Sequence, residues 1–60
     1  MAASRREQIL SAAVVCVAEE GFHKTTMAHV IQRSGLSAGA VYGYFRGKDE
    51  IIAAIAEQAL

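Results

Sequence analysis

The stretch from Thr25 to Phe45, TTMAHVIQRSGLSAGAVYGYF, decides the fold. The hydroxyl of Thr26, with that of Thr25 as the alternative, can accept a free first-turn amide and so predicts the start of a helix. Gly35 is the residue type that supplies a left-handed turn after a helix, and Ser37 is a suitable cap for the next one. The stretch therefore predicts two short helices joined by a tight turn, which is a helix-turn-helix.

The second of these helices is poor by intrinsic propensity. Gly39 and Gly43 each destabilise it by about 1 kcal/mol relative to alanine. Val41 and Phe45, four residues apart, are expected to face the core. Glycine is suited to a surface that approaches another backbone closely, and a recognition helix in the groove of a DNA duplex is such a surface.

Four residues of this helix remain to face outward or sideways, namely Ala38, Gly39, Tyr42 and Tyr44. Two phenol rings beside a glycine surface favour contact with a partner. The alternative is that one of the two tyrosines lies at the edge of the core.

Two further helices are expected to flank the helix-turn-helix. The first runs from about Arg5 to Glu20, with Ser4 and Glu7 forming a capping box and Gly21 just past its end. Its apolar face comprises Ile9, Leu10, Ala13, Val14, Cys16 and Val17, and the middle helix adds Met27, Val30 and Ile31. The last runs from Lys48 to Leu60, with Ile51, Ile52, Ile55 and Ala59 on one side. The predicted fold class is all-α: a three-helix, homeodomain-like helix-turn-helix bundle plus the start of a fourth helix.

Composition indicates one small folded domain, but it does not by itself favour binding to nucleic acid. A chain of 60 residues is one domain at most, and a hydrophobic fraction of 53% favours a folded chain. Six basic and six acidic residues give a net charge of zero, which is a weak electrostatic footprint for a DNA-binding protein. The positions of the cations then matter more than their sum: Arg5, Arg6, Lys24, Arg33, Arg46 and Lys48. An ordinary mixed surface is the alternative interpretation of these charges.

Catalysis and metal binding find little support. The single cysteine, Cys16, lies among valines and is expected to be a small core residue. His23 and His29 are too few for a metal site. A pairing of Cys16 with either histidine lacks an oxyanion motif and a third orienting group, so we expect no enzyme activity and no cofactor.

A secretory signal is a second alternative for the amino-terminal region. Arg5 and Arg6 precede an apolar run, residues 9–18, of suitable length. Glu7 among the basic residues and the acidic pair at 19–20 argue against it. No apolar run approaches the ~20 residues that span a bilayer, so we expect no membrane helix.

The ordered set of these residues resembles the amino-terminal DNA-binding domain of the TetR family of transcriptional regulators. The matching residues are Arg6-Glu7-Gln8-Ile9-Leu10, Ala12-Ala13, Glu20-Gly21-Phe22, Thr25-Thr26 and, from Gly35 to Lys48, GLSxGxVYxYFxxK. The resemblance covers essentially the whole chain. It implies a helix-turn-helix domain at residues 1–47, with its third helix in the major groove. Residues 48–60 would begin a helix connecting to a ligand-binding and dimerisation domain that is absent from this sequence.

The resemblance also implies which residues contact bases or phosphates: Thr26, Ser37, Ala38, Gly39, Tyr42, Tyr44 and Lys48. Hydroxyls and free amides at helix starts suit phosphate oxygens. Lys48 is in the first turn of its helix, where a cation opposes the helix dipole unless a phosphate is beside it. The alternative is that Asp49 and Glu50 neutralise Lys48 locally.

Several positions depart from the family pattern. Ala38, Ala40 and Gly43 stand where polar or basic residues are frequent, and His29 stands where an acidic residue often completes the cap of the second helix. We therefore expect contacts with thymine methyl groups and reliance on phosphates and DNA shape.

The expected function is sequence-specific DNA binding by a regulator, a ligand-responsive repressor that occupies a double-stranded operator as a homodimer. Dimerisation and the small-molecule effector site would lie in the absent carboxyl-terminal domain. The resemblance places such a protein in the bacterial cytoplasm, associated with the nucleoid. The alternative is a small helical protein-interaction module, in which Tyr42, Tyr44 and the neighbouring glycines contact a partner helix.

Overall fold

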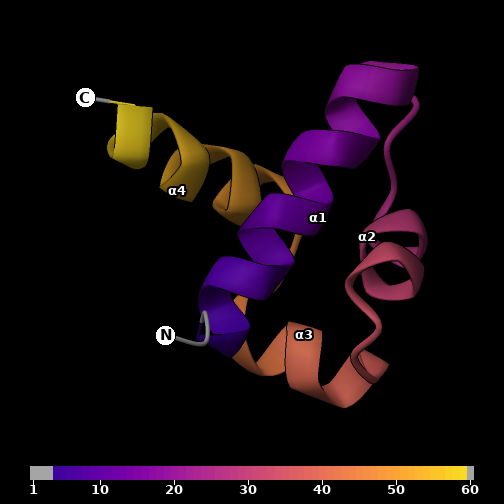
Figure 1. Ribbon diagram of the computed structural model, residues 1–60, viewed down its shortest axis with the longest axis vertical. Coiled ribbons are helices and arrows are strands. Elements are labelled where there is room, and N and C mark those ends of the chain that lie inside the picture. The colour runs from indigo at the N-terminus through magenta and orange to yellow at the C-terminus, as the bar shows by residue number, and fades with distance from the viewer. Residues whose placement is uncertain (1–3, 60) are drawn as a thin grey trace.

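The computed structural model describes residues 4–59, which form four α-helices and no strand (Figure 1). Helix α1 spans Arg5–Glu20, α2 spans Met27–Ser34, α3 spans Ala38–Tyr44 and α4 spans Lys48–Ala59. Helix α1 runs through the centre, with contacts to α2 and α4, and α2 also contacts α3. The all-α helix-turn-helix fold expected from the sequence is confirmed.

Three hydroxyls begin three helices in the same way. Each accepts the backbone N–H three residues on: Ser4 from Glu7 at 3.1 Å, Thr26 from His29 at 3.2 Å and Ser37 from Ala40 at 3.1 Å. One half of the predicted capping box differs, because the Glu7 carboxylate accepts a hydrogen bond from the Ser4 hydroxyl at 3.3 Å. Since a hydroxyl both donates and accepts, it can bond the amide and the carboxylate of the same residue.

The predicted turn between α2 and α3 is confirmed at Gly35, whose φ of 75° and ψ of 6° are left-handed. The neighbouring Ser34 is buried. Its hydroxyl donates to the carbonyl of Ile31 at 2.8 Å and accepts from the amide of Leu36 at 3.2 Å. One buried side chain thus satisfies two backbone groups that the end of α2 leaves without helical partners.

The loop between α1 and α2 settles which threonine begins α2. Thr26 is the N-cap, whereas Thr25 is buried and donates its hydroxyl to the carbonyl of Gly21 at 2.8 Å. Gly21 has a φ of 86°, a value that favours glycine. Thr25 therefore closes the loop, and Thr26 starts the helix.

The core lies where α1 meets the other helices. Its buried apolar residues are Ile9, Leu10, Ala12, Ala13, Cys16, Val30, Val41, Phe45, Ile51 and Ala54. Met27, Ile31, Leu36 and Ile55 pack against this core while remaining partly exposed.

One detail of the predicted apolar faces needs correction. Val14 was expected in the core but is 48% exposed, and Ala12 is buried in its place. Helix α1 packs against α2 and α4. Which of its residues are buried therefore depends on the positions of these helices more than on the size of each side chain. In α4, Ile51 is buried and Ile52 and Ile55 are half-buried, whereas the side chain of Ala59, predicted on the same face, is outside what the structure describes, as is Leu60, the predicted end of the helix. No helix within residues 4–59 has both the length and the apolar character to cross a membrane.

Candidate nucleic-acid interface

Helix α3 buries one side and displays the other. Val41 and Phe45 are almost completely buried, as predicted. Tyr42 and Tyr44 are 46% and 48% exposed, so neither ring is inserted in the core. About half of each side chain remains open to a partner, while the other half is covered by the fold.

The glycines of α3 have no role inside the fold. A β-carbon added at Gly39 or at Gly43 would meet no atom within 4 Å, and neither residue has a positive φ. Neither packing nor backbone conformation therefore requires glycine at these two positions. With the exposed Ala38, they leave a surface of low relief beside the two tyrosines.

Thr26 and Ser37 lie exposed at the starts of α2 and α3. Each hydroxyl oxygen accepts a hydrogen bond from its own helix, as described above. The hydroxyl hydrogen remains available, because a serine or threonine side chain is a donor as well as an acceptor. Each cap can therefore donate to an anion beside its helix.

Lys48 is half-buried and held by Phe22. Its Nζ donates to the Phe22 carbonyl at 2.8 Å and lies 4.3 Å from the centroid of the Phe22 ring. This contact places the ammonium beside the loop that leads to Thr26. Lys48 forms no ion pair with Asp49 or Glu50, and the Glu50 carboxylate instead accepts from the Arg46 backbone amide at 3.0 Å.

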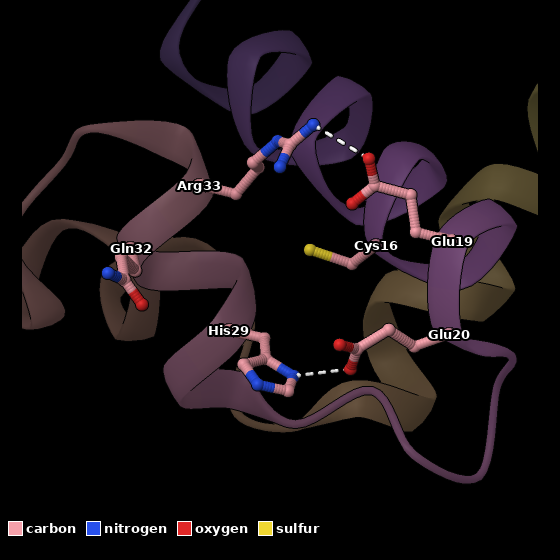
Figure 2. A pocket seen from close by; sticks show the side chains of 6 residues that line it. All are labelled: Cys16, Glu19, Glu20, His29, Gln32 and Arg33. Atoms are coloured by element: carbon pink, nitrogen blue, oxygen red, sulfur yellow. Dashed lines mark hydrogen bonds and ion pairs between the residues drawn. The ribbon is translucent and has the colours of Figure 1, made fainter.

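The ion pairs found within residues 4–59 join α1 to α2, and Figure 2 shows both of them. Arg33 contacts the carboxylate of Glu19 at 3.1 Å, and Nδ1 of His29 lies 3.3 Å from that of Glu20. All four side chains are about half exposed. His29, which replaces the acidic residue frequent in the family, thus faces an acid on α1.

Cys16 lies between these two pairs, in a groove of about 350 Å³ (Figure 2). Burial raises the pKa of the Cys16 thiol above its ordinary value, with Glu19 and Glu20 adding to the rise and Arg33 opposing it. The thiol is therefore neutral near pH 7, as expected for a small core residue. Among residues 4–59, no three histidine, cysteine or acidic side chains are grouped closely enough to hold a metal ion.

Two contacts that sequence patterns did not predict attach α1 to the helix-turn-helix. The Arg6 guanidinium lies 5.5 Å above the centroid of the Phe45 ring. Gln8 donates through Nε2 to the carbonyl of Ser34 at 2.7 Å. The partners are far apart along the chain, so no local periodicity signals either contact. They fix the first turn of α1 against α3 and against the turn that precedes it.

Comparison with known proteins agrees with this geometry. Residues 9–55 match the family described as "Bacterial regulatory proteins, tetR family". The HTH-type transcriptional repressor Rv1474c of Mycobacterium tuberculosis is 43% identical over 56 residues, covering 93% of this chain and 30% of that protein. The HTH-type transcriptional regulator BetI of Escherichia coli is 35% identical over 54 residues, covering 90% and 28%.

A solved structure shares the fold. The fatty acid degradation regulator FadR from Bacillus halodurans superposes with a TM-score of 0.88 at 25% sequence identity, covering 98% of this chain and 31% of that protein. The chain thus spans less than a third of the length of each relative. It belongs to the TetR family of bacterial regulatory proteins and corresponds to the amino-terminal helix-turn-helix DNA-binding domain of that family.

Proposed function

We propose that this domain reads a double-stranded DNA operator by placing α3 in the major groove. The observation that carries the proposal is the outer face of α3, where Tyr42 and Tyr44 are exposed beside two glycines that the fold does not require. Such a face destabilises the isolated helix, and a closely approaching duplex gives it a use.

Phosphate contacts come from two residues beside the loop between α1 and α2: Thr26, which follows the loop, and Lys48, which contacts Phe22 within it. The Thr26 hydroxyl and the first free amides of α2 point to an anion at the start of that helix. The ammonium of Lys48 has three N–H donors, of which one is bonded to the Phe22 carbonyl. A phosphate that accepts from Lys48 would also relieve the unfavourable position of this cation in the first turn of α4.

Base contacts come from α3 itself. Tyr42 and Tyr44 supply hydroxyl groups and ring edges, while Ala38 and the backbone at Gly39 supply apolar contact to a thymine methyl group. Ser37 positions the start of the helix through a phosphate. Since Ala40 and Gly43 carry no polar side-chain atoms, we infer that DNA shape contributes a large share of the sequence preference.

The remaining features of the regulator are proposed from its relatives. The chain spans about 30% of the repressor from Mycobacterium tuberculosis. We infer that residues 1–47 form the DNA-binding unit and that 48–60 begin a helix leading to a further domain. That domain would hold the dimer contacts and the effector pocket of a repressor acting in the bacterial cytoplasm, at the nucleoid.

Enrichment of random duplexes on the full-length regulator, followed by titration of salt, tests the proposal. A pseudo-palindromic site should emerge, because a two-fold dimer reads two half-sites. The logarithm of the binding constant should fall with the logarithm of salt concentration by about 0.9 per phosphate contacted. The alternative of a protein-interaction module predicts no enriched sequence and almost no salt dependence, and either result would overturn operator binding.

A further inference from the structure

We propose that Arg6 is an additional phosphate contact, which extends the interface past the carboxyl end of α3 to the first turn of α1. The inference rests on the proposed operator binding and adds a contact outside the helix-turn-helix itself. Its ligand is a backbone phosphate flanking the bases that α3 reads.

The cation–π contact of Arg6 with Phe45 places the charge of this side chain beside the end of α3. Phe45 is the C-cap of α3, directly after Tyr44, and its ring is buried in the core. The guanidinium carbon of Arg6 lies 5.5 Å from the centre of that ring, within the range of a cation–π contact. The cation of a long, otherwise mobile side chain is thereby held at the end of the proposed recognition helix.

The backbone that carries Arg6 is fixed as well. Gln8 bonds the carbonyl of Ser34 at the turn before α3, and the next two residues, Ile9 and Leu10, are buried in the core. Arg6 is therefore mounted on the same rigid unit as Tyr42. A contact mounted in this way loses little conformational entropy on binding.

The Arg6 guanidinium remains open to a ligand. Arg6 is exposed, forms no ion pair within residues 4–59, and none of the side-chain hydrogen bonds found in that range uses its N–H groups. The guanidinium carries five N–H donors in a planar fork that matches a phosphate, and a cation–π contact uses none of them as a hydrogen bond.

The charges around Arg6 also favour a ligand for its guanidinium, because they do not explain a cation at this position. Arg5 and Arg6 occupy the first turn of α1, where a cation opposes the helix dipole. Glu7 offsets part of this cost, but its carboxylate bonds the Ser4 hydroxyl. Arg46, the residue after Phe45, is also exposed and without an ion pair among the described residues. Arg6 and Arg46 therefore lie at the carboxyl end of α3, and neither forms an ion pair with a carboxylate within residues 4–59.

The test compares three variants of the full-length regulator, Arg6→Ala, Arg6→Lys and the control Arg33→Ala, on the duplex enriched by the parent protein. Arg33 is matched in charge, but its cation already contacts Glu19 on the α1–α2 side. Binding is measured between about 50 and about 200 mM salt, and circular dichroism verifies that each variant is folded. Ethylation interference maps the phosphates that each protein contacts.

Loss of one phosphate contact should reduce the salt slope of Arg6→Ala by about 0.9, so that its affinity falls about threefold less than that of the parent over this salt range. Arg6→Lys should keep the parent's slope because the charge remains, and Arg33→Ala should match the parent. Ethylation of one phosphate per half-site should no longer interfere with binding by Arg6→Ala.

If Arg6→Ala is folded and keeps the parent's slope and interference pattern, the contact does not exist, although operator binding by the parent stands. If the parent itself enriches no duplex, the proposed function fails and this inference fails with it. An equal loss of slope in Arg33→Ala would assign the effect to overall charge and would likewise overturn the contact at Arg6.

Discussion

The outer face of α3 and the outer face formed by α1 with α2 differ in whether their polar side chains are paired within the fold. On the α1–α2 side, Glu19 and Glu20 meet Arg33 and His29, so charges of opposite sign lie together (Figure 2). On α3, the two half-exposed tyrosines form no side-chain hydrogen bond within residues 4–59, and the two glycines lie beside open space. The charges of the first face are paired within the fold, whereas the exposed side chains of the second are the ones that we propose to contact DNA.

The same comparison shows why a neutral chain can bind DNA. Net charge is zero over the whole sequence, but two of the six acidic residues, Glu19 and Glu20, lie on the α1–α2 side, each beside a basic side chain of α2. Lys48 and Arg6 instead contact aromatic rings, which leave their charges uncompensated. The distribution of charge over the surface therefore matters more for association than its sum.

The largest expected effect is that of Tyr42→Ala on operator affinity. Loss of this side chain should weaken binding by at least about tenfold, since a good base contact contributes about 1–3 kcal/mol. Stability should change by less than about 0.5 kcal/mol because the ring is half exposed. Val14→Ala is the matched control, being equally exposed on α1, and should bind as the parent does. Equal affinities of parent and Tyr42→Ala in a gel-shift titration would remove Tyr42 from the interface.

Two glycine substitutions are expected to change the free energy of unfolding in opposite directions. Gly35→Ala should lower the free energy of unfolding by about 1–2 kcal/mol, because the alanine would adopt a left-handed conformation. Gly39→Ala should raise it by up to about 1 kcal/mol, because alanine is the better helix former and its methyl group meets nothing in the fold.

Urea unfolding of both variants measures these changes, and operator titration completes the experiment. Gly39→Ala should bind the operator more weakly although it is more stable, because its methyl group would enter the space that the duplex occupies. A Gly39→Ala variant with both higher stability and full affinity would show that this surface is not in close contact with DNA.

A smaller effect is expected for Lys48→Met. Methionine keeps an apolar stem against the Phe22 ring while removing the charge, so the electrostatic role is isolated. The salt slope should fall by about 1, with a similar loss of affinity for operator and random duplexes, because a phosphate contact carries no sequence information. A loss confined to the operator would instead assign Lys48 a role in reading bases.

The smallest effect is expected for the α1–α2 ion pairs. A double-mutant cycle on Glu19 and Arg33, measured by thermal unfolding, should give a coupling free energy of about 0.2–1 kcal/mol because both side chains are half exposed. Operator affinity of Arg33→Ala should equal that of the parent. A reduced salt slope in this variant would contradict the division of the molecule into a self-paired face and a DNA-binding face.

Local chemistry made the helix boundaries predictable from the sequence. Thr26, Gly35 and Ser37 act within three or four residues of themselves, so the caps and the turn could be predicted from the sequence. The choice between Thr25 and Thr26 was made by the structure, in which the Thr25 hydroxyl is bonded to the carbonyl of Gly21. The inward pair Val41 and Phe45 followed from helical spacing in the same way. The same spacing placed Tyr42 and Tyr44 outward or sideways, with one of them at the edge of the core as the alternative. It thereby predicted the surface that we propose for DNA.

Tertiary structure decided what long-range packing controls. Helical spacing could not distinguish Val14 from Ala12 in the core, because that choice depends on which helices surround α1. The same limit applies to the contacts of Lys48 with Phe22 and of Arg6 with Phe45, whose partners lie 26 and 39 residues apart. The sequence by itself determined four helices and one outward face, because caps and periodicity are local. The positions of the cations around that face depend on how the helices pack, which only the folded chain defines.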